Sequence, residues 1–223
     1  DALGVDPDHN SGFARDPMSG GRVSGVATTR GAIAAGRVGI CVAGNSGPVA
    51  AFAGLELPIE AHTLQAFVTE PVKPMIDTVI MSQSLHCYIS QSDKGGIALG
   101  GDPDHFPSYA QRGLPPRIEK AAAEAIALVP ALSRLRMVRC WAGTTDMSFD
   151  GSPILSALPV DGLYLNGGWC YGGFKATPAS GWCYAHLLAT GDNHPLAAPF
   201  AFDRFARGAT IDEASVGVLP QLR

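Results

Sequence analysis

The 223-residue sequence is short of charge, since Asp, Glu, Lys and Arg make up only 16% of it, against about 25% in an average soluble domain. No basic stripe occurs and the formal net charge is −4, which excludes a nucleic-acid binder that relies on neutralising phosphates. Hydrophobic residues make up 46%, which excludes intrinsic disorder. No apolar run reaches the roughly 18 residues that a membrane-spanning helix needs. We therefore expect a cytoplasmic protein with no membrane or nucleic-acid partner.

The sequence also lacks the common motifs for metals, phosphates and nucleophilic serine. Neither CxxC nor HExxH occurs, so we expect no metal site and predict that the five scattered Cys are free thiols. Ser46 follows an apolar run, but GxSxG is absent, which argues against a nucleophile elbow. GxxxxGK[ST] and GxGxxG are also missing, so the chain has no dinucleotide fingerprint of its own.

What is present is a chain divided into short segments by 27 Gly and 17 Pro residues. The apolar run at residues 38–43 is typical of a strand covered on both faces, as in parallel α/β sheets. Helical patterns predict a short helix at 48–53, an amphipathic helix at Ile118–Val129 and a helix that begins near Thr177-Pro178. Strands are predicted at residues 22–26, 32–42, 63–69, 78–81, 86–90, 96–99, 135–145 and 163–166. This order predicts a mixed α/β fold whose sheet domain is interrupted by an antiparallel middle lobe.

The loop from Gly167 to Lys175 is the sharpest local feature. Four of its nine positions are Gly, so its backbone can approach a ligand closely, and a helix start with a nearby Lys favours an anion. On these residues alone, a plain Gly-rich connection is the alternative. Arg139 and Asp146 flank Trp141-Ala142-Gly143 and are interpreted as an ion pair or as turn support in a strand corner.

Taken in order, several segments resemble the later two-thirds of the β subunits of heterotetrameric sarcosine oxidases, which belong to the D-amino-acid-oxidase-like FAD-dependent oxidoreductases. WAGxxD…DxxPI is shared with the wider group, whereas GGFKATP and the final DRFARGATIDE are more specific. The segments are VSGVATTRGAIAAGRVGICVAGNSG, HTLQAFVTEPVKP, SQSDKGGIALGGD, RLRMVRCWAGTTDMSFDGSPIL and DGLYLNGGWCYGGFKATPASGWCYAH.

The resemblance implies FAD-dependent oxidative demethylation of sarcosine or a similar N-methyl amino acid. It implies that Lys175 holds the substrate carboxylate, and Lys94 is a weaker catalytic candidate for the role of the Lys that activates oxygen in monomeric relatives. A sister flavin dehydrogenase for an N-methylglutamate-like substrate, or a non-catalytic truncated subunit, are the alternatives. The cofactor-binding positions that it implies are Ala43, Gly44, Gly168, Gly172, Gly173, Phe174 and Thr177.

The resemblance also implies a domain plan and partners. The ADP-binding βαβ unit and the FMN-attachment segment are expected before Asp1, with FMN present in the full complex and other sarcosine oxidase subunits as partners. Residues 1–54 and 151–200 are then parts of the FAD-binding domain, 55–150 form the substrate-binding lobe, and 201–223 form a carboxyl-terminal tail.

Overall fold

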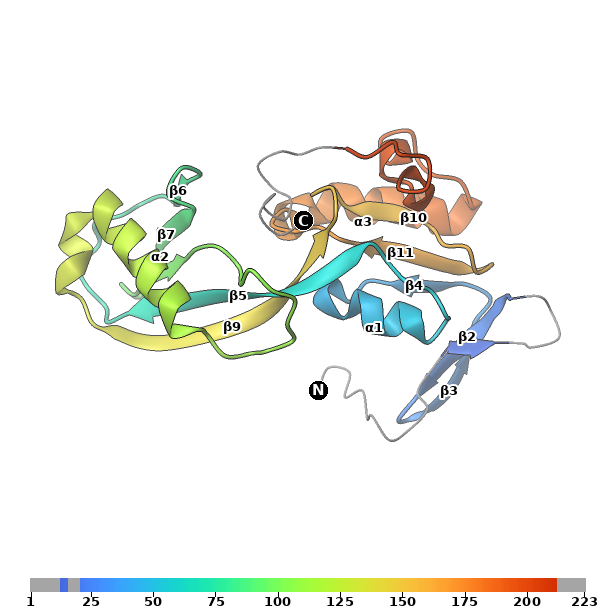
Figure 1. Ribbon diagram of the computed structural model, residues 1–223, viewed down its shortest axis with the longest axis horizontal. Coiled ribbons are helices and arrows are strands. Elements are labelled where there is room, and N and C mark those ends of the chain that lie inside the picture. The colour runs from blue at the N-terminus through green and yellow to red at the C-terminus, as the bar shows by residue number, and fades with distance from the viewer. Residues whose placement is uncertain (1–12, 16–20, 212–223) are drawn as a thin grey trace. The chain divides into compact units, whose positions relative to one another are not determined.

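The computed structural model describes residues 13–15 and 21–211, and most of its helices and strands are labelled in Figure 1. Within this part the chain forms two compact units: the first combines residues up to 60 with residues from 146 onward, and the second holds residues 61–145. The mixed α/β fold class is confirmed, while the four-part division by function stays a prediction. No helix in the described ranges combines the length and apolarity that crossing a membrane requires.

The first unit is built on a three-stranded sheet in the order β10-β11-β4. β11 (Leu163–Gly167) runs parallel to β4 (Val38–Ile40), with Leu165 opposite Ile40, and β10 (Ile154–Ala157) pairs antiparallel with β11. The parallel pairing confirms what the continuous apolar run predicted. Because parallel strands end at the same edge of a sheet, the segments that follow β4 and β11 come together there.

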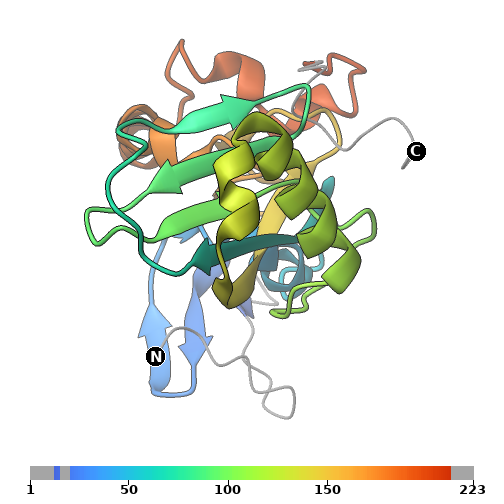
Figure 2. The same cartoon turned by 90° about the vertical axis from the view of Figure 1, so that its left-hand side faces the viewer.

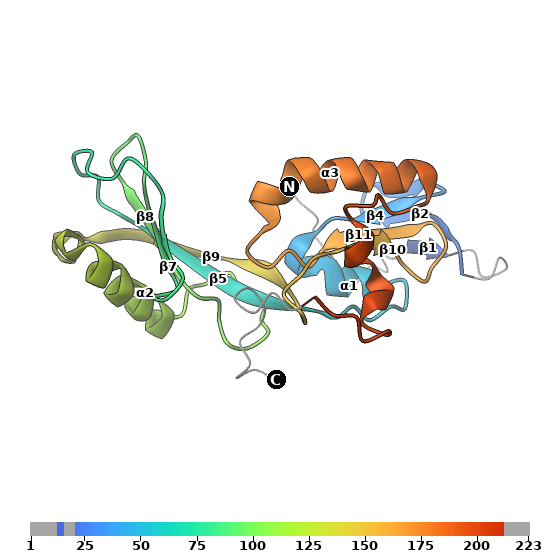
Figure 3. The ribbon, with the colours of Figure 1, turned by 90° about the horizontal axis from the view of Figure 1, so that it is seen from above.

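Two helices cover the two faces of this sheet. α1 (Ser46–Ala51) and α3 (Gly173–Thr190) lie on opposite sides of it (Figure 3). The alternation of side chains along β11 explains this arrangement, since Leu165 packs in the cluster that includes α1 and its neighbour Tyr164 packs in the cluster that includes α3. Side chains therefore pack against both faces of the sheet. The end of the sheet where β4 and β11 stop is the part left for a ligand.

α3 begins more than a turn earlier than the sequence predicts. We expected Pro178 near the first helical position, but the helix starts at Gly173 and Pro178 lies inside it. The N–H of Ala176 already donates to the Gly172 carbonyl at 3.2 Å, so the first turn forms ahead of the proline. Pro178 cannot donate the hydrogen bond that the carbonyl of Phe174 would accept, and its ring lies against the same carbonyl, which is a local cost inside α3.

A second three-stranded sheet, in the order β1-β2-β3, belongs to the first unit. Its strands are β1 (Phe13–Arg15), β2 (Val23–Thr28) and β3 (Gly31–Ala34). In the turn between β2 and β3, Thr28 Oγ1 accepts the N–H of Arg30 at 3.1 Å. The predicted strand at 32–42 is wrong in its continuity, because β3 ends at Ala34 and β4 begins at Val38. The two halves pair with different strands, β2 and β11.

The second unit is an antiparallel sheet in the order β6-β7-β8-β5-β9, with one face covered by α2 (Pro115–Leu128) (Figure 2). Its strands are β5 (Ile59–Thr69), β6 (Ile80–Ser82), β7 (Cys87–Gln91), β8 (Ile97–Gly100) and β9 (Met137–Ser148). Ile118, Ala125 and Ile126 of α2 pack in one cluster with Ile89 and Leu99, which confirms the predicted apolar stripe. The predicted strands at 86–90 and 96–99 correspond to β7 and β8, which pair antiparallel as a hairpin.

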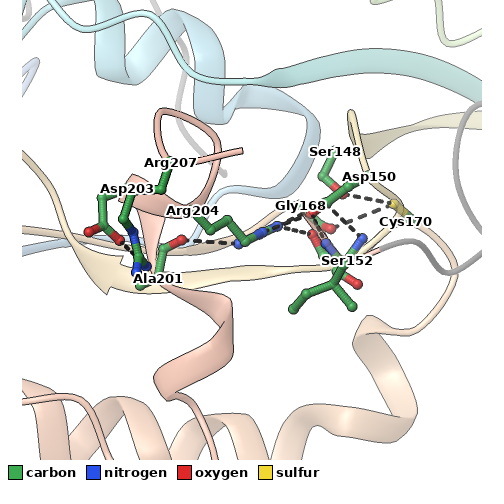
Figure 4. Close-up of polar contacts among 10 residues, drawn as sticks. Ser148, Asp150, Ser152, Gly168, Cys170, Ala201, Asp203, Arg204 and Arg207 are labelled. Carbon is green, nitrogen blue, oxygen red and sulfur yellow. Dashed lines mark hydrogen bonds and ion pairs between the residues drawn. The ribbon is translucent and has the colours of Figure 1, made fainter. Parts of the chain in front are cut away.

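A buried ion pair holds the segment after α3, which contains short 3-10 turns at Ala198–Phe200 and Phe202–Arg204 (Figure 4). Arg204 Nε donates to Asp150 Oδ2 at 2.8 Å, and Nη2 donates to Asp150 Oδ1 and to the Ser152 carbonyl, both at 2.9 Å. The guanidinium lowers the pKa of the Asp150 carboxyl. The sequence carries no local signal for this pairing, because the two residues lie 54 positions apart.

The five cysteines are free thiols, and they differ in exposure. Cys87, Cys170 and Cys183 are buried, as expected of thiols packed like small hydrophobes. Cys41 is exposed, because it follows the last residue of β4 at the sheet edge.

Candidate functional site

The segments that follow β4 and β11 bend through unusual backbone geometry. Among the described residues other than Gly, positive φ angles occur at Ala43, His86 and Cys170. Ala43 (φ +47°) follows β4, and Cys170 (φ +53°) follows β11 together with Gly168 (φ +72°). Such conformations are strained for residues with a Cβ and concentrate at functional sites. The common edge of β4 and β11 is therefore the candidate site.

α3 begins at this edge without a capping side chain. Its N-cap residue is Gly172, no side chain supplies a cap hydrogen bond, and no acidic residue lies in the first turn. The N–H groups of Gly173, Phe174 and Lys175 have no carbonyl within the helix to bond. With the macrodipole, they present roughly half a positive charge. This helix start can hold an anion or the electron-rich edge of a heterocycle.

Two side chains of the first turn of α3 face outward. Phe174 is 97% exposed, and Lys175 is exposed as well. A cation at the third helical position opposes the macrodipole by about 0.3–1 kcal/mol. An exposed Phe gains nothing from burial. The cation at the helix start and the exposed Phe are both unfavourable for the stability of the chain alone. Such features are expected of a helix start that binds a ligand.

The loop before α3 is a compact turn built around Trp169. Its indole N–H donates to Asn166 Oδ1 at 2.7 Å, and its carbonyl accepts the N–H of Gly172 at 2.8 Å. A Cβ at Gly173 would lie 3.2 Å from Trp169 Cβ, and one at Gly172 would lie 3.4 Å from the Trp169 carbonyl oxygen. Glycine therefore keeps this turn tight and leaves bare backbone for close approach of a ligand.

Asp146, near the end of β9, anchors the same turn. Its side chain is buried, and Oδ2 accepts the N–H of Gly168 at 2.5 Å. Its main-chain carbonyl accepts the N–H of Cys170 at 2.9 Å. Burial raises the pKa of the Asp146 carboxyl, and the backbone N–H groups of Gly168 and Trp169 act in the opposite direction. The interpretation of Asp146 as turn support is confirmed, while Arg139 stays exposed on β9.

One hydroxyl at the edge is left without a partner. Ser46, the first residue of α1, is fully buried, and its Oγ makes no hydrogen bond within the described part of the chain. A Cβ at Gly167 would lie 3.2 Å from this oxygen, so the hydroxyl lies against the end of β11. A buried unpaired hydroxyl costs about 1–3 kcal/mol. The Ser46 hydroxyl is thus an unsatisfied polar group that is packed against the end of β11.

The structure gathers the predicted cofactor-binding residues at or beside this edge. Gly44 is buried in a 3-10 turn (Ala43–Asn45), and Thr177 Oγ1 donates to the Gly173 carbonyl at 3.0 Å. Lys94, the weaker catalytic candidate, lies in the exposed turn between β7 and β8 of the second unit. The roles of these residues stay predictions. The cofactor-binding residues in question are Ala43, Gly44, Gly168, Gly172, Gly173, Phe174 and Thr177.

The sequence profile of the family described as "FAD dependent oxidoreductase" matches residues 11–187. The chain belongs to this family. "Sarcosine oxidase subunit beta" of Rhizobium meliloti (strain 1021) is 54% identical over 222 residues, which are 100% of this chain and 53% of that protein. "Sarcosine oxidase subunit beta" of Rhodobacter capsulatus is 48% identical over 212 residues, 95% of this chain and 51% of that one. The predicted resemblance is thus confirmed.

Among solved structures, L-proline dehydrogenase from P. horikoshii is similar in fold. It superposes with a TM-score of 0.80 at 27% identity and covers 88% of this chain and 53% of its own. The chain spans about half the length of these relatives.

The site at the edge of β4 and β11 fits FAD, the cofactor of this family. The isoalloxazine ring needs a bare backbone for close approach, which Gly172 and Gly173 would supply. Its pyrimidine edge gains negative charge on reduction, which the uncapped start of α3 would stabilise.

Proposed function

We propose that the chain takes part in the FAD-dependent oxidative demethylation of sarcosine or a similar N-methyl amino acid, as part of a β-type subunit. The identity of 48–54% to two sarcosine oxidase β subunits supports the proposal. The observation that carries it is the uncapped, outward-facing start of α3 with Lys175 beside it. Oxidation of an amino acid at a flavin needs both elements: donors for the flavin edge and a cation for the substrate carboxylate.

The chemistry that bound FAD would supply is a two-electron oxidation of the substrate's N-methyl group, and water would hydrolyse the imine product to glycine and formaldehyde. The chain supplies binding and electrostatics. The N–H groups of Gly173 and Phe174 stabilise the negative charge that develops at the pyrimidine edge. The Lys175 ammonium pairs with the substrate carboxylate and fixes the substrate at the ring.

Other sarcosine oxidase subunits are the proposed protein partners, because the relatives named above are themselves subunits. A sister activity on another secondary amino acid is the second candidate. It is favoured by the likeness to a protein titled L-proline dehydrogenase, which is 27% identical with a TM-score of 0.80.

Anaerobic titration of the complete purified protein tests these proposals. The visible absorbance of oxidised flavin is followed as sarcosine, N-methylglutamate or L-proline is added. We expect sarcosine to bleach the flavin at the lowest concentration. Bleaching by L-proline but not by sarcosine would support the second candidate. Colourless protein would contradict both and support a non-catalytic chain.

A further inference from the structure

Asp146 is a buried carboxylate that has no cation to balance it. It is 5% exposed, and no Lys, Arg or His within the described residues forms an ion pair with it. Asp150, four residues later and 4% exposed, is paired with Arg204 at 2.8 Å. Burying an unpaired carboxylate is costly unless N–H groups satisfy it. The hydrogen bonds that Asp146 accepts therefore indicate the role of this buried side chain.

Those bonds go to two residues of the loop before α3 that have positive φ, Gly168 and Cys170. The carboxylate accepts the Gly168 N–H, and the main-chain carbonyl accepts the Cys170 N–H. The positive φ of Cys170 is strained for a residue with a Cβ. The bonds of Trp169 to Asn166 and Gly172 close the turn itself, and the two bonds from Asp146 tie it to the end of β9. Since α3 begins three residues after Cys170, the same bonds fix the direction of its first turn.

We infer that Asp146 is a positioning residue for the flavin: it acts through the Gly168–Gly172 turn to aim the first N–H groups of α3 at the flavin edge. The inference rests on the proposed function. Asp146 does this as a hydrogen-bond acceptor and not as a charge, because a negative charge near a ring that gains negative charge would oppose reduction. A neutral acceptor of the same shape should therefore replace it.

Three substitutions in the complete protein separate the size, the charge and the hydrogen-bond acceptor of the Asp146 side chain. Asp146→Leu keeps the size and removes the acceptor, Asp146→Glu keeps the charge and displaces the acceptor, and Asp146→Asn keeps the shape and one acceptor. Asp161→Leu is the control, since Asp161 is an exposed partner of Arg22 far from the loop. The dissociation constant of FAD and the absorption spectrum of bound flavin are measured for each.

We expect the FAD dissociation constant to rise about tenfold or more in the Leu and Glu variants, with spectra closer to that of free FAD. The Asn variant should stay within about threefold of the wild type, as should the Asp161 control. This rescue distinguishes positioning from a structural requirement for the carboxylate. If the Leu variant does not fold, the FAD affinities of the Glu and Asn variants test the inference.

Equal affinity in all Asp146 variants would overturn the inference, and so would a weakened Asn variant beside an unaffected Glu variant. In both cases the wild type would still hold flavin and oxidise sarcosine, so the proposed function would stand. Wild-type protein without flavin would overturn the proposed function and this inference with it.

Discussion

The starts of α2 and α3 share three local features. Neither N-cap residue supplies a side-chain hydrogen bond, and neither first turn contains an acidic residue. Each helix has a cation at its third position, Arg117 in α2 and Lys175 in α3. By local sequence alone, both could be taken for anion sites.

Within the protein, the start of α2 is already satisfied. Pro115 and Pro116 have no N–H, so two of the donors that a helix start normally leaves unpaired do not exist. The Arg117 side chain is 16% exposed and lies 3.9 Å from the buried carboxylate of Asp104. The first turn of α2 therefore has few unpaired donors, and its cation is paired with Asp104. These features stabilise the second unit.

The start of α3, unlike that of α2, retains N–H donors and a cation without partners in the described part of the chain. Gly173, Phe174 and Lys175 all retain their N–H groups, and both large side chains point outward. The difference teaches that a helix start becomes a candidate binding site when the fold leaves its donors and its cation unused. Four substitutions follow from this comparison, in order of decreasing expected effect.

Replacing the cation of α3 should affect the substrate. Lys175→Ala is expected to raise the KM for sarcosine about 10- to 100-fold, because a charge-assisted bond to the carboxylate is lost, while protein stability stays unchanged. Steady-state kinetics of the complete protein measure this, with Lys73→Ala as a control at another exposed lysine. An unchanged KM would show that Lys175 does not hold the carboxylate.

Replacing the cation of α2 should affect stability instead. Arg117→Ala removes the ion-pair partner of the buried Asp104, whose carboxylate keeps the hydrogen bond from Gln65, and is expected to cost about 1–3 kcal/mol. That corresponds to a fall in Tm of roughly 2–4 °C per kcal/mol for a chain of this size. Thermal unfolding checks it against Arg134→Ala, an exposed control. If Arg117→Ala changed KM and left Tm unaltered, the comparison would be reversed.

The carboxylate beside α2 should give a pH signature. Burial raises the pKa of Asp104 above 3.8, although Arg117, Gln65 and His62 oppose the shift. The folded state then holds this proton more tightly than the unfolded state, so stability falls as the pH rises from 3.8 through the folded pKa. Asp104→Asn should flatten the unfolding free energy in that window. Parallel pH curves for the variant and the wild type would contradict the assignment.

The smallest effect is expected at the hydroxyl in the first turns of α3. Thr177→Val removes the bond to the Gly173 carbonyl and a polar group near the proposed flavin edge, so FAD affinity should fall by about two- to fivefold. Thr190→Val is the comparison at the far end of the helix, where Thr190 Oγ1 donates to the His186 carbonyl in the same way and also accepts the Asp192 N–H. Equal effects of the two would indicate a helix property and not a binding one.

Much of the fold follows from patterns that the sequence carries locally. The apolar run that became β4 and the stripe of α2 are local signals, and both were predicted. The break between β3 and β4 was not, because it depends on which strands the two halves pair with. The start of α3 was placed too late for a similar reason: Pro178 is a strong local signal, but the turn that Asp146 anchors decides where the helix begins.

The sequence allowed the loop of the site to be predicted, but not the contacts that this loop makes with distant segments. Gly167 to Lys175 stood out by composition, and the family resemblance gave its residues their roles. The unpaired hydroxyl of Ser46 and the pairing of Asp150 with Arg204 had no local signal, since both depend on segments far apart in the chain. Asp146 was singled out, but its partner at Gly168 was visible only in the structure.

Amide hydrogen exchange of the complete protein, with and without FAD, tests most directly whether α3 starts at a flavin site and α2 does not. FAD should slow exchange in peptides that cover residues 168–176, where the N–H groups of Gly173, Phe174 and Lys175 are proposed to face the ring. Peptides that cover residues 114–120 should exchange equally in both states, since the N–H groups of Arg117 and Ile118 already bond the Leu114 carbonyl. Unchanged exchange at residues 168–176 on FAD binding would contradict the account.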